Sequence, residues 1–452
     1  MIKKILIVIF FIIVLIFVSL WNLVTDGYDK QNRFILFLKD IIPRSLAVSV
    51  RDTFFIIPEL KYQNKLLKTQ VKKYEQGLDG KQFNEKLISL KDINFKFKEF
   101  YLPFKQLDIK AGWNKLSNTF RAHYFEIIDD KVLVLSGEGS FITFDKMNFN
   151  IDKLNQKKIN SNLEILLNES GYEFFGVRDI LYSDEKIYIS VILKNFNGFT
   201  MNIYQADYNA KTEFINFSVF FKKNEYTKKY TIQTGGRLAN FKDNKILFSL
   251  GASEELKSKV QNEDNLEGKI ISIDKTTNDY EILSKGHRNP QGLIYINTKD
   301  IIINSEHGPL GGDEINLNNI NNTNQKIKVK NFGWPISSYG IEYDGSDPYQ
   351  KSHQKFGFEE PFKYFSPSIG ISQILFLKKG DKNFKNLLFV TSLRASSIYI
   401  LELSENFDEI ISEDRIYFNE QRIRDLNYDK DLNSLLLIFE NTPSIGILKF
   451  IN

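Results

Sequence analysis

The amino-acid sequence predicts an all-β fold, a six-bladed β-propeller over residues 101–452, preceded by an N-terminal transmembrane helix and a short helical stem. Three observations predict it. A module of short apolar strands separated by Asp, Asn and Lys turns recurs six times, mostly at intervals of about 50–60 residues, as propeller blades do. The chain ends on a further apolar strand, residues 446–451, which can complete a ring. A long apolar run stands near the start of the chain.

The apolar run covers residues 5–24 and follows Lys3 and Lys4. Its length of about 20 residues is what a helix needs to cross a bilayer core. A cleaved signal peptide is the alternative, but it would have a shorter apolar region and a small-residue cleavage site. We therefore expect residues 1–24 to be an uncleaved anchor. The two lysines favour a cytoplasmic N-terminus, which predicts a single-pass protein of a bacterial inner membrane with its main domain in the periplasm.

Residues 25–100 differ in character from the rest of the chain. The segment 59–77 is highly charged, has no glycine before Gly77, and carries Leu and Val at roughly helical spacing. Pro43 and Pro58 punctuate the segments before it. We interpret residues 25–100 as a helical stem or linker that lifts the main domain off the membrane.

The six copies of the strand module justify the blades one by one. They cover residues 125–145, 180–207, 238–274, 293–308, 374–403 and 423–451. One longer interval, of about 80 residues, can hold an inserted loop. Such small sheets bury their faces only against neighbours, which favours a closed ring over the alternative, a two-layer β-sandwich. Residues 101–109 can add a strand before the first copy, so that the two ends of the domain share a blade.

Composition excludes several functional classes. The 60 basic and 56 acidic residues leave a net charge of only +4, so we expect no nucleic-acid partner. The absence of cysteine excludes disulfides, thiolate nucleophiles and Cys-based metal sites. Only four histidines occur, too few to favour a multi-His metal site. We expect His123 either to face the mouth of the ring or to have a structural role. We expect His287 to pack or hydrogen-bond within its motif, and His353 to lie on the surface.

Unusual polar residues concentrate in four segments at repeat boundaries. These are residues 286–293 (GHRNPQGL), 305–314 (SEHGPLGGDE), 331–335 (NFGWP) and 421–425 (QRIRD). Taken singly, each is compatible with ordinary turn chemistry or a solvated surface. In this order they resemble the soluble glucose dehydrogenases and the related bacterial aldose sugar dehydrogenases, six-bladed propellers that carry pyrroloquinoline quinone (PQQ). The resemblance runs from about residue 165 to the end and is weak over the first blade and the stem.

The resemblance implies a cofactor site. PQQ carries three carboxylates, which guanidinium groups recognise well. The positions that match the family's cofactor contacts are Arg288, Asn289, Arg394 (where soluble glucose dehydrogenases have Lys), Arg422 and Arg424. The resemblance also implies a calcium ion on the quinone, held by the backbone carbonyls of Gly308 and Pro309, where oxygen ligands suit a hard cation. A second, structural calcium implied by the family has Glu342 and Glu360 as its nearest candidate ligands.

The implied reaction oxidises the anomeric hydroxyl of an aldose to a lactone, and the electrons pass to a respiratory acceptor. In the family a His removes the hydroxyl proton and an Asp orients it. The matching positions are Gln233 and Asp313, and an amide cannot accept a proton near neutral pH. A cofactor-contacting Gln of the family is also missing from residues 170–176.

Three hypotheses follow from these departures. In the first, Asp313 or His307 takes over as base in a PQQ- and calcium-dependent dehydrogenase. In the second, the protein is a non-catalytic PQQ- or sugar-binding propeller, a sensor or scaffold. In the third, the motifs persist only as fold-forming features with no ligand. The first hypothesis is our leading prediction.

Overall fold

A computed structural model describes residues 80–91, 93–104, 122–242, 244–320, 329–342, 352–378 and 385–451. The predicted anchor, residues 1–24, and most of the predicted stem lie outside this range. No helix within these residues is long and apolar enough to span a membrane.

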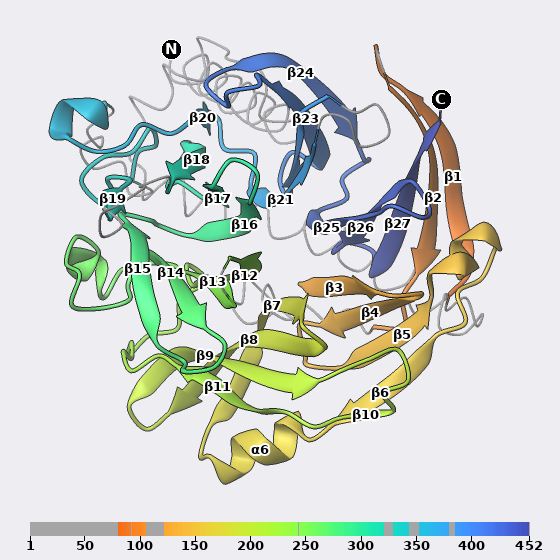
Figure 1. The fold of residues 1–452 in the computed structure, drawn as a ribbon, viewed down its shortest axis with the longest axis horizontal. Helices are drawn as coiled ribbons and strands as arrows, with labels where there is room; N and C mark the ends of the chain where they lie inside the picture. Colours follow the sequence, from red (N-terminus) through yellow and green to blue (C-terminus); the bar gives the residue numbers. More distant parts are fainter. Residues whose placement is uncertain are drawn as a thin grey trace, which may run out of the picture. The chain divides into compact units, whose positions relative to one another are not determined.

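Six small sheets stand around a common centre and form a six-bladed β-propeller (Figure 1). The first blade contains β3 (His123–Ile128), β4 (Lys131–Ser136), β5 (Phe141–Asp145), β6 (Lys157–Ser161) and β10 (Phe214–Ile215). The second contains β7 (Glu173–Ser183), β8 (Lys186–Asn195), β9 (Gly198–Asp207) and β11 (Ser218–Lys222). The third contains β12 (Gly235–Phe241), β13 (Lys245–Leu250), β14 (Lys269–Asp274), β15 (Tyr280–Lys285) and β19 (Lys330–Asn331).

The later blades match the later copies of the module. The fourth contains β16 (Pro290–Ile296), β17 (Ile301–Glu306), β18 (Asp313–Asn319) and β20 (Lys363–Phe365). The fifth contains β21 (Ile371–Leu377), β22 (Leu387–Ser392), β23 (Ser397–Leu403) and β24 (Ile410–Tyr417). The sixth contains β25 (Ile423–Asp429), β26 (Ser434–Phe439), β27 (Ser444–Ile451), β2 (Asn94–Tyr101) and β1 (Gln82–Ser89). The described helices are short: α6 (Leu163–Glu169) and the 3₁₀ turns η1 (Lys146–Asn150), η2 (Lys257–Lys259) and η3 (Gln354–Phe356).

The two ends of the domain share the sixth blade, as predicted, but through a different segment. β2 pairs antiparallel with β27 from Asn94 opposite Ile451 to Tyr101 opposite Ser444, and β1 adds an outer strand. The prediction of a stem up to residue 100 is therefore wrong at its end, and the closing strand lies before the predicted segment and overlaps it only at Tyr101. The physical reason is the period-two pattern of β2, in which Phe95 and Phe97 are buried between exposed neighbours.

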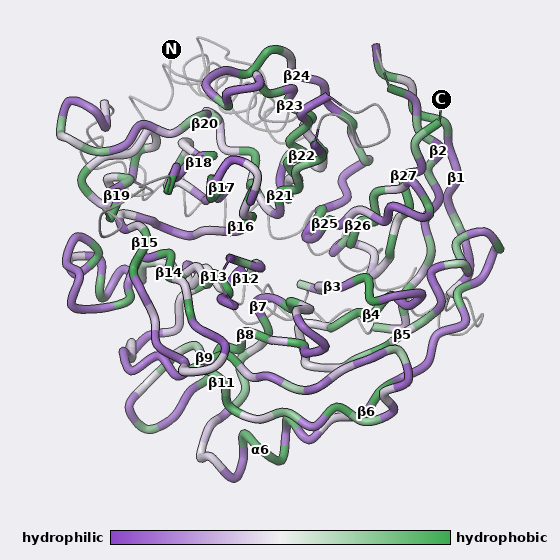
Figure 2. The backbone as a smooth tube through the Cα atoms, viewed as in Figure 1, coloured by the Kyte–Doolittle hydropathy of each residue, from purple (hydrophilic) through white to green (hydrophobic). Residues whose placement is uncertain are grey.

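The core lies between the blades, where the faces of neighbouring sheets pack together. The second strand of each blade is largely buried, and β17, β22 and β26 are buried along their whole length. Hydrophobic stretches accordingly follow the strands, and hydrophilic ones follow the turns (Figure 2). The fifth and sixth blades, for example, share one cluster that includes Phe97, Phe389 and Phe439.

A single arginine ties the innermost strands together at the centre of the ring. The innermost strand of each blade contacts that of the next, in cyclic order. Arg237 on β12 is 2% exposed, and its Nη1 donates to Asp179 Oδ1 (2.9 Å) and Asp425 Oδ1 (3.2 Å). Its Nε donates to the Gln291 carbonyl (2.6 Å) and its Nη2 to the Arg424 carbonyl (2.9 Å). One side chain thus bonds the second, fourth and sixth blades to the third.

The two remaining blades join the same network. The Tyr124 ring of the first blade lies 4.9 Å from the guanidinium carbon of Arg237, in cation–π geometry. Gln373 of the fifth blade donates to Asp425 Oδ1 (3.2 Å). Burial and the nearby Asp425 charge raise the pKa of Asp179 to about 7, although Arg237 opposes the shift. The centre therefore holds two carboxylates that depend on one buried cation.

We predict that Arg237→Met destabilises the domain by about 3–5 kcal/mol, because removal of one partner leaves buried carboxylates uncompensated. Urea unfolding at neutral pH measures the difference. Lys186→Met serves as the control, since Lys186 pairs with Asp207 at the exposed end of a hairpin, and it is expected to change stability by less than about 1 kcal/mol. Equal stability of the Arg237 variant and the wild type would refute the central role of this arginine.

Candidate functional site

The residues predicted from the motifs gather on one face of the ring. The loops that precede β12, β16 and β25 share this face with the turns after β17, β22 and β26, because neighbouring strands of a blade run antiparallel. We call it the mouth face. It carries Gln233, Arg288, Asn289, His307, Gly308, Pro309, Arg394, Arg422 and Arg424.

Arg288 is held in place by several bonds. Its Nη1 donates to the carbonyls of Gly308 (2.7 Å) and His307 (3.2 Å), and its backbone N–H donates to Glu306 Oε2 (2.7 Å). The guanidinium carbon lies 5.1 Å from the Trp334 ring centroid. Arg288 is therefore a buried cation directly beside the predicted calcium-binding turn.

Behind Arg288 lies a buried relay that fixes its backbone. His287 Nδ1 lies 3.1 Å from Glu306 Oε1, and His287 Nε2 lies 2.8 Å from Ser284 Oγ. Asn316 Nδ2 donates to the same Glu306 oxygen (2.6 Å). The expectation that His287 packs and hydrogen-bonds is confirmed. Glu306 itself was not singled out from the sequence, although its place in the SEHGP motif was the available signal.

Gln233 pairs with Arg288 rather than with Asp313. With its amide oriented to satisfy both neighbours, its oxygen accepts from Arg288 Nη2 (2.9 Å) and its nitrogen donates to the Ala252 carbonyl (3.1 Å). A side-chain amide in this position serves as a hydrogen-bonding bridge between the third and fourth blades. It has no proton-accepting capacity at neutral pH.

Asp313 supports the backbone of the mouth face. It is 1% exposed, and its Oδ1 and Oδ2 accept from the backbone N–H groups of Gly308 (3.2 Å) and Ile371 (3.0 Å). The pairing of base and Asp implied by the resemblance has no counterpart between Asp313 and position 233, because Gln233 pairs with Arg288 instead. Asp313 fixes the Gly308 turn against the start of β21.

His307 has one nitrogen committed and one with a lone pair. Its Nε2 lies 2.6 Å from the Ile371 carbonyl, which can only accept, so the proton resides on Nε2 and the lone pair on Nδ1. Burial lowers the pKa of His307, and the charges of Arg424 and Arg288 lower it further, against the opposing effect of Asp313. His307 is therefore a neutral imidazole at physiological pH.

Arg422 and Arg424 share one buried carboxylate. Their Nε groups donate to the two oxygens of Glu440, at 2.8 Å and 2.5 Å respectively. Burial alone would raise the pKa of Glu440, but the two arginines outweigh it and lower the pKa to about 2. Glu440 was not predicted, because nothing in its local sequence distinguishes it from other turn carboxylates. Arg394 lies exposed on the turn between β22 and β23.

A continuous chain of hydrogen bonds connects these arginines to Asn289. Arg424 Nη1 donates to Gln291 Oε1 (2.9 Å), and Gln291 Nε2 donates to Asn289 Oδ1 (3.0 Å). The same Asn289 oxygen accepts from the backbone N–H of Gly235 (3.2 Å). The chain runs from the sixth blade to the third, so the predicted cofactor contacts belong to one rigid network.

These residues fit an anionic cofactor. Four guanidinium groups lie on the mouth face with the buried carboxylates of Glu306, Asp313 and Glu440, so positive charge gathers where a tricarboxylate would bind. The Gly308 turn is rich in carbonyl oxygens, since a Cβ on Gly308 would collide with those of Gly311 and Gly312. Backbone carbonyls are suitable calcium ligands, and the Gly308 oxygen carries the Arg288 bond.

The candidates for a second calcium have separate partners. Glu342 pairs with Lys257, and Glu360 accepts from Tyr339 Oη (2.8 Å) and the Gln354 N–H (2.8 Å). Within the residues that the structure covers, no group of three or more His, Cys, Asp or Glu side chains could hold a metal ion.

The other two histidines are buried. His353 is 1% exposed and stacks on Tyr339 at 5.4 Å, so its prediction as a surface residue is wrong. The described residues around it pack on the segment that follows β19, where Phe358 and His353 lie against Gly333. His123 is 3% exposed beside the Phe104 ring, and burial lowers its pKa to about 4.

Comparison with known sequences gives a family match that begins in the second blade and matches to curated relatives. The family described as Glucose / Sorbosone dehydrogenase matches residues 176–448. The Aldose sugar dehydrogenase YliI of Escherichia coli (strain K12) is 31% identical over 232 residues, which cover 48% of this chain and 59% of that protein. The chain thus spans less than two thirds of the curated relatives it matches.

Solved structures share the fold. A crystal structure of a glucose dehydrogenase has a TM-score of 0.58 at 20% identity, with 74% of this chain and 98% of that chain covered. The PQQ-bound form of an aldose sugar dehydrogenase from Streptomyces coelicolor has a TM-score of 0.53 at 18% identity, with 79% and 99% covered. At such identities the likeness establishes the propeller fold alone.

We predict that Glu440→Gln destabilises the domain by about 3 kcal/mol at pH 7, because a pKa lowered from 4.5 to about 2 stabilises the ionised folded state. This contribution is full above pH 4.5 and disappears as the pH falls towards 2. Urea unfolding from pH 7 to pH 3 measures it. Glu413→Gln, which breaks an exposed pair with Lys363, is the control. A pH-independent difference between wild type and Glu440→Gln would contradict the prediction.

Proposed function

The chain belongs to the glucose/sorbosone dehydrogenase family, and on this premise we propose that it is a PQQ- and calcium-dependent dehydrogenase. Its proposed reaction is the oxidation of the anomeric hydroxyl of an aldose to a lactone. The observation that carries the proposal is the cluster of arginines on the mouth face, in which Arg288, Arg422 and Arg424 are held by partners from the chain itself.

The proposed cofactor contacts are Arg288, Asn289, Arg394, Arg422 and Arg424. Arg422 commits its Nε to Glu440 and keeps its two terminal amino groups outside that bond, where they suit a carboxylate of the cofactor. Glu440 keeps both guanidinium groups oriented before any ligand arrives, which lowers the cost of ordering them on binding. The backbone carbonyls of Gly308 and Pro309 are the proposed calcium ligands.

PQQ, when bound with calcium, supplies the hydride acceptor and the Lewis acid. The chain must supply the group that takes the hydroxyl proton. Gln233 is an amide, and both Asp313 oxygens accept from backbone N–H groups. His307 remains, with a lone pair on Nδ1 and a pKa low enough to keep it neutral. We assign the proton acceptor to His307, for a contribution of about 10²–10⁴-fold, as positioned bases provide.

The alternative function is a non-catalytic propeller that binds PQQ or a sugar as a sensor or scaffold. One observation favours it: the position of the family's base holds an amide that is already bonded on both sides, to Arg288 and Ala252. The cofactor-binding arginines are the same in both functions, so turnover alone separates them.

The cellular setting is part of the proposal. Residues 5–24 have the length and hydrophobicity of a membrane span. With such an anchor the propeller would work in the periplasm of a bacterial inner membrane and pass electrons to a respiratory acceptor.

We predict that the protein takes up PQQ in the presence of calcium and that Arg424→Met weakens this uptake about 10–100-fold, because a charge-assisted hydrogen bond contributes about 1.5–3 kcal/mol. Fluorescence titration with PQQ, with calcium or with a chelator, gives the Kd. Arg415→Met is the matched control. Arg415 lies on β24, the outer strand of the fifth blade, and donates to the Ser397 hydroxyl and the Ala395 carbonyl.

Two outcomes of this titration would count against the proposed enzyme. Absence of uptake by the wild type at micromolar PQQ and millimolar calcium would overturn both the enzyme and the PQQ-binding alternative. Uptake without dye reduction across a panel of aldoses would favour the non-catalytic propeller.

We predict that kcat/KM of the loaded enzyme falls on the acid side with a pKa below 6.5, because His307 accepts a proton only while it is neutral and its pKa is lowered. His307→Gln should lose at least about 100-fold in kcat and abolish this acid limb. Its Kd for PQQ should stay within about twofold of the wild type. Full activity of His307→Gln would exclude this assignment, as would a large gain of activity in Gln233→His.

A further inference from the structure

A buried arginine that the motifs did not single out lies at the boundary between the second and third blades. Arg178 is on β7, the inner strand of the second blade, and is 6% exposed. Its Nε donates to the Gly235 carbonyl (3.2 Å) and its Nη2 to the Ile232 carbonyl (3.3 Å). Both carbonyls belong to the loop at the start of β12, so the guanidinium reaches the mouth face.

The charge of Arg178 is not paired with a carboxylate in the part of the chain that the structure describes. Its two partners there are neutral carbonyls. The next residue, Asp179, is already bonded to Arg237 and to the Leu238 N–H. By contrast, the buried guanidinium of Arg424 pairs with a carboxylate of the chain itself. Burying a cation without an anion is costly, and a bound anion would offset that cost.

Arg178 also keeps N–H groups available for a ligand. Its Nη1 makes no hydrogen bond to the described residues, and it is not one of their enclosed polar atoms that lack a partner. Nη1 therefore faces open space. The two carbonyl bonds fix the plane of the guanidinium before any ligand arrives, which lowers the cost of ordering this side chain on binding.

The start of β12 is shaped to accept the Arg178 side chain. Gly236 has a φ of +111°, and a Cβ built on it would lie 2.4 Å from Arg178 Cβ. A larger residue at position 236 would therefore strain the backbone and displace the arginine. The close approach of Gly236 lets Arg178 lie against the loop that carries Gln233.

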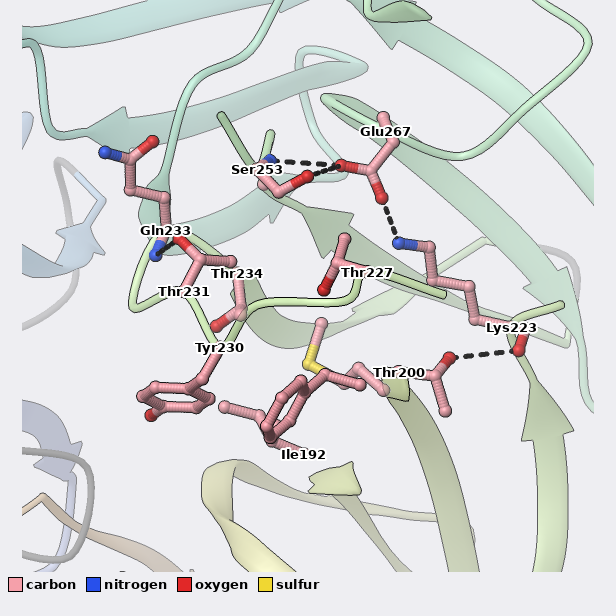
Figure 3. Close-up of a pocket in the computed structure, with 13 residues that line it drawn as sticks. Ile192, Thr200, Lys223, Thr227, Tyr230, Thr231, Gln233, Thr234, Ser253 and Glu267 are labelled. Carbon is pink, nitrogen blue, oxygen red and sulfur yellow. Dashed lines mark hydrogen bonds and ion pairs between the residues drawn. The ribbon is translucent and has the colours of Figure 1, made fainter. Parts of the chain in front are cut away.

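The pocket between the second and third blades is too small to be the place where such an anion binds. Figure 3 shows this pocket, whose wall includes Gln233 of the same loop. It has room for only about two water molecules, and Arg178 is not in its lining. The loop instead connects Arg178 to the candidate cofactor contacts, because the Gly235 N–H donates to Asn289 Oδ1 (3.2 Å). An anion at Arg178 would therefore adjoin the candidate cofactor site.

We propose that Arg178 binds a carboxylate at the mouth face. The inference rests on the proposed function for the source of that carboxylate, which is either the cofactor or an aldose that bears an acid group, as a uronic acid does. A guanidinium recognises both through charge-assisted hydrogen bonds. Arg178 would be a fifth cation beside the four predicted arginines of the mouth face.

Two titrations of matched variants test the proposal and separate the two sources. Fluorescence titration with PQQ and calcium gives the Kd of the cofactor. Isothermal titration with D-glucuronate and D-glucose, with the protein cofactor-free and loaded with reduced PQQ, gives the preference for an acid group. Arg178→Gln should weaken the binding of PQQ or of glucuronate at least about tenfold and leave glucose unchanged. Arg178→Lys keeps the charge and should bind the same ligand at least about threefold more tightly than Arg178→Gln. Arg415→Gln is the control and should match the wild type.

The outcomes separate this inference from the function on which it rests. Weaker PQQ binding by Arg178→Gln than by Arg415→Gln assigns the carboxylate to the cofactor, and a loss confined to glucuronate assigns it to the substrate. Equal binding of both ligands by these two variants overturns the inference. Equal losses of affinity and of thermal stability in Arg178→Gln and Arg178→Lys also overturn it, because Arg178 would then only hold the loop. If the wild type takes up no PQQ, the dehydrogenase fails, and glucuronate binding by the cofactor-free protein alone decides the role of Arg178.

Discussion

The buried guanidinium of Arg237 is the contact on which the rest of the molecule depends. The blades of a propeller surround a central channel, where polar side chains can join the inner edges of the sheets. Arg237 makes these bonds to Asp179, Asp425 and the carbonyls of Gln291 and Arg424. Gln291 and Arg424 also belong to the hydrogen-bond chain of the mouth face. The same arginine that closes the ring thus sets the position of the candidate cofactor contacts.

The positive charge of the mouth face is stabilised from within the protein. Glu440 holds Arg422 and Arg424 from the turn after β26, and Glu306 holds the backbone of Arg288 from the end of β17. Both carboxylates are almost fully buried: Glu440 is 2% exposed and Glu306 is 3% exposed. Solvent therefore screens their charges poorly, and their attraction for the neighbouring arginine residues is strong. The arginines are therefore oriented before a ligand binds, and a ligand carboxylate meets a surface that needs little reorganisation.

The regular repeat predicted the ring, whereas the resemblance of the boundary motifs to a known family predicted which residues of the mouth face matter. Because neighbouring strands of a blade run antiparallel, the loops before first strands, which carry Arg288 and Arg422, share a face with the turn after β22, which carries Arg394. Glu440 and Glu306 were not predicted as partners, because strand pairing within a blade brings them beside arginines that lie 16 to 18 residues away along the chain. One error had a cause visible in the sequence, since the alternation of Phe95 and Phe97 marked a strand inside the presumed stem. The other did not, because His353 is buried by a tertiary contact with Tyr339.

The replacement of a base by Gln233 becomes intelligible beside Arg288. The Gln233 oxygen lies 2.9 Å from a guanidinium nitrogen of Arg288. A histidine nitrogen in the same place would have to take up its proton beside that positive charge, and the repulsion between like charges opposes protonation. An amide accepts from Arg288 and donates to Ala252 without that repulsion. Gln233 therefore helps to hold the Arg288 guanidinium in place, but it cannot accept a proton. His307 meets a milder form of the same repulsion, since Arg288 touches its carbonyl rather than its ring. Its Nε2–H is fixed by Ile371, which leaves Nδ1 as the nitrogen that can take a proton.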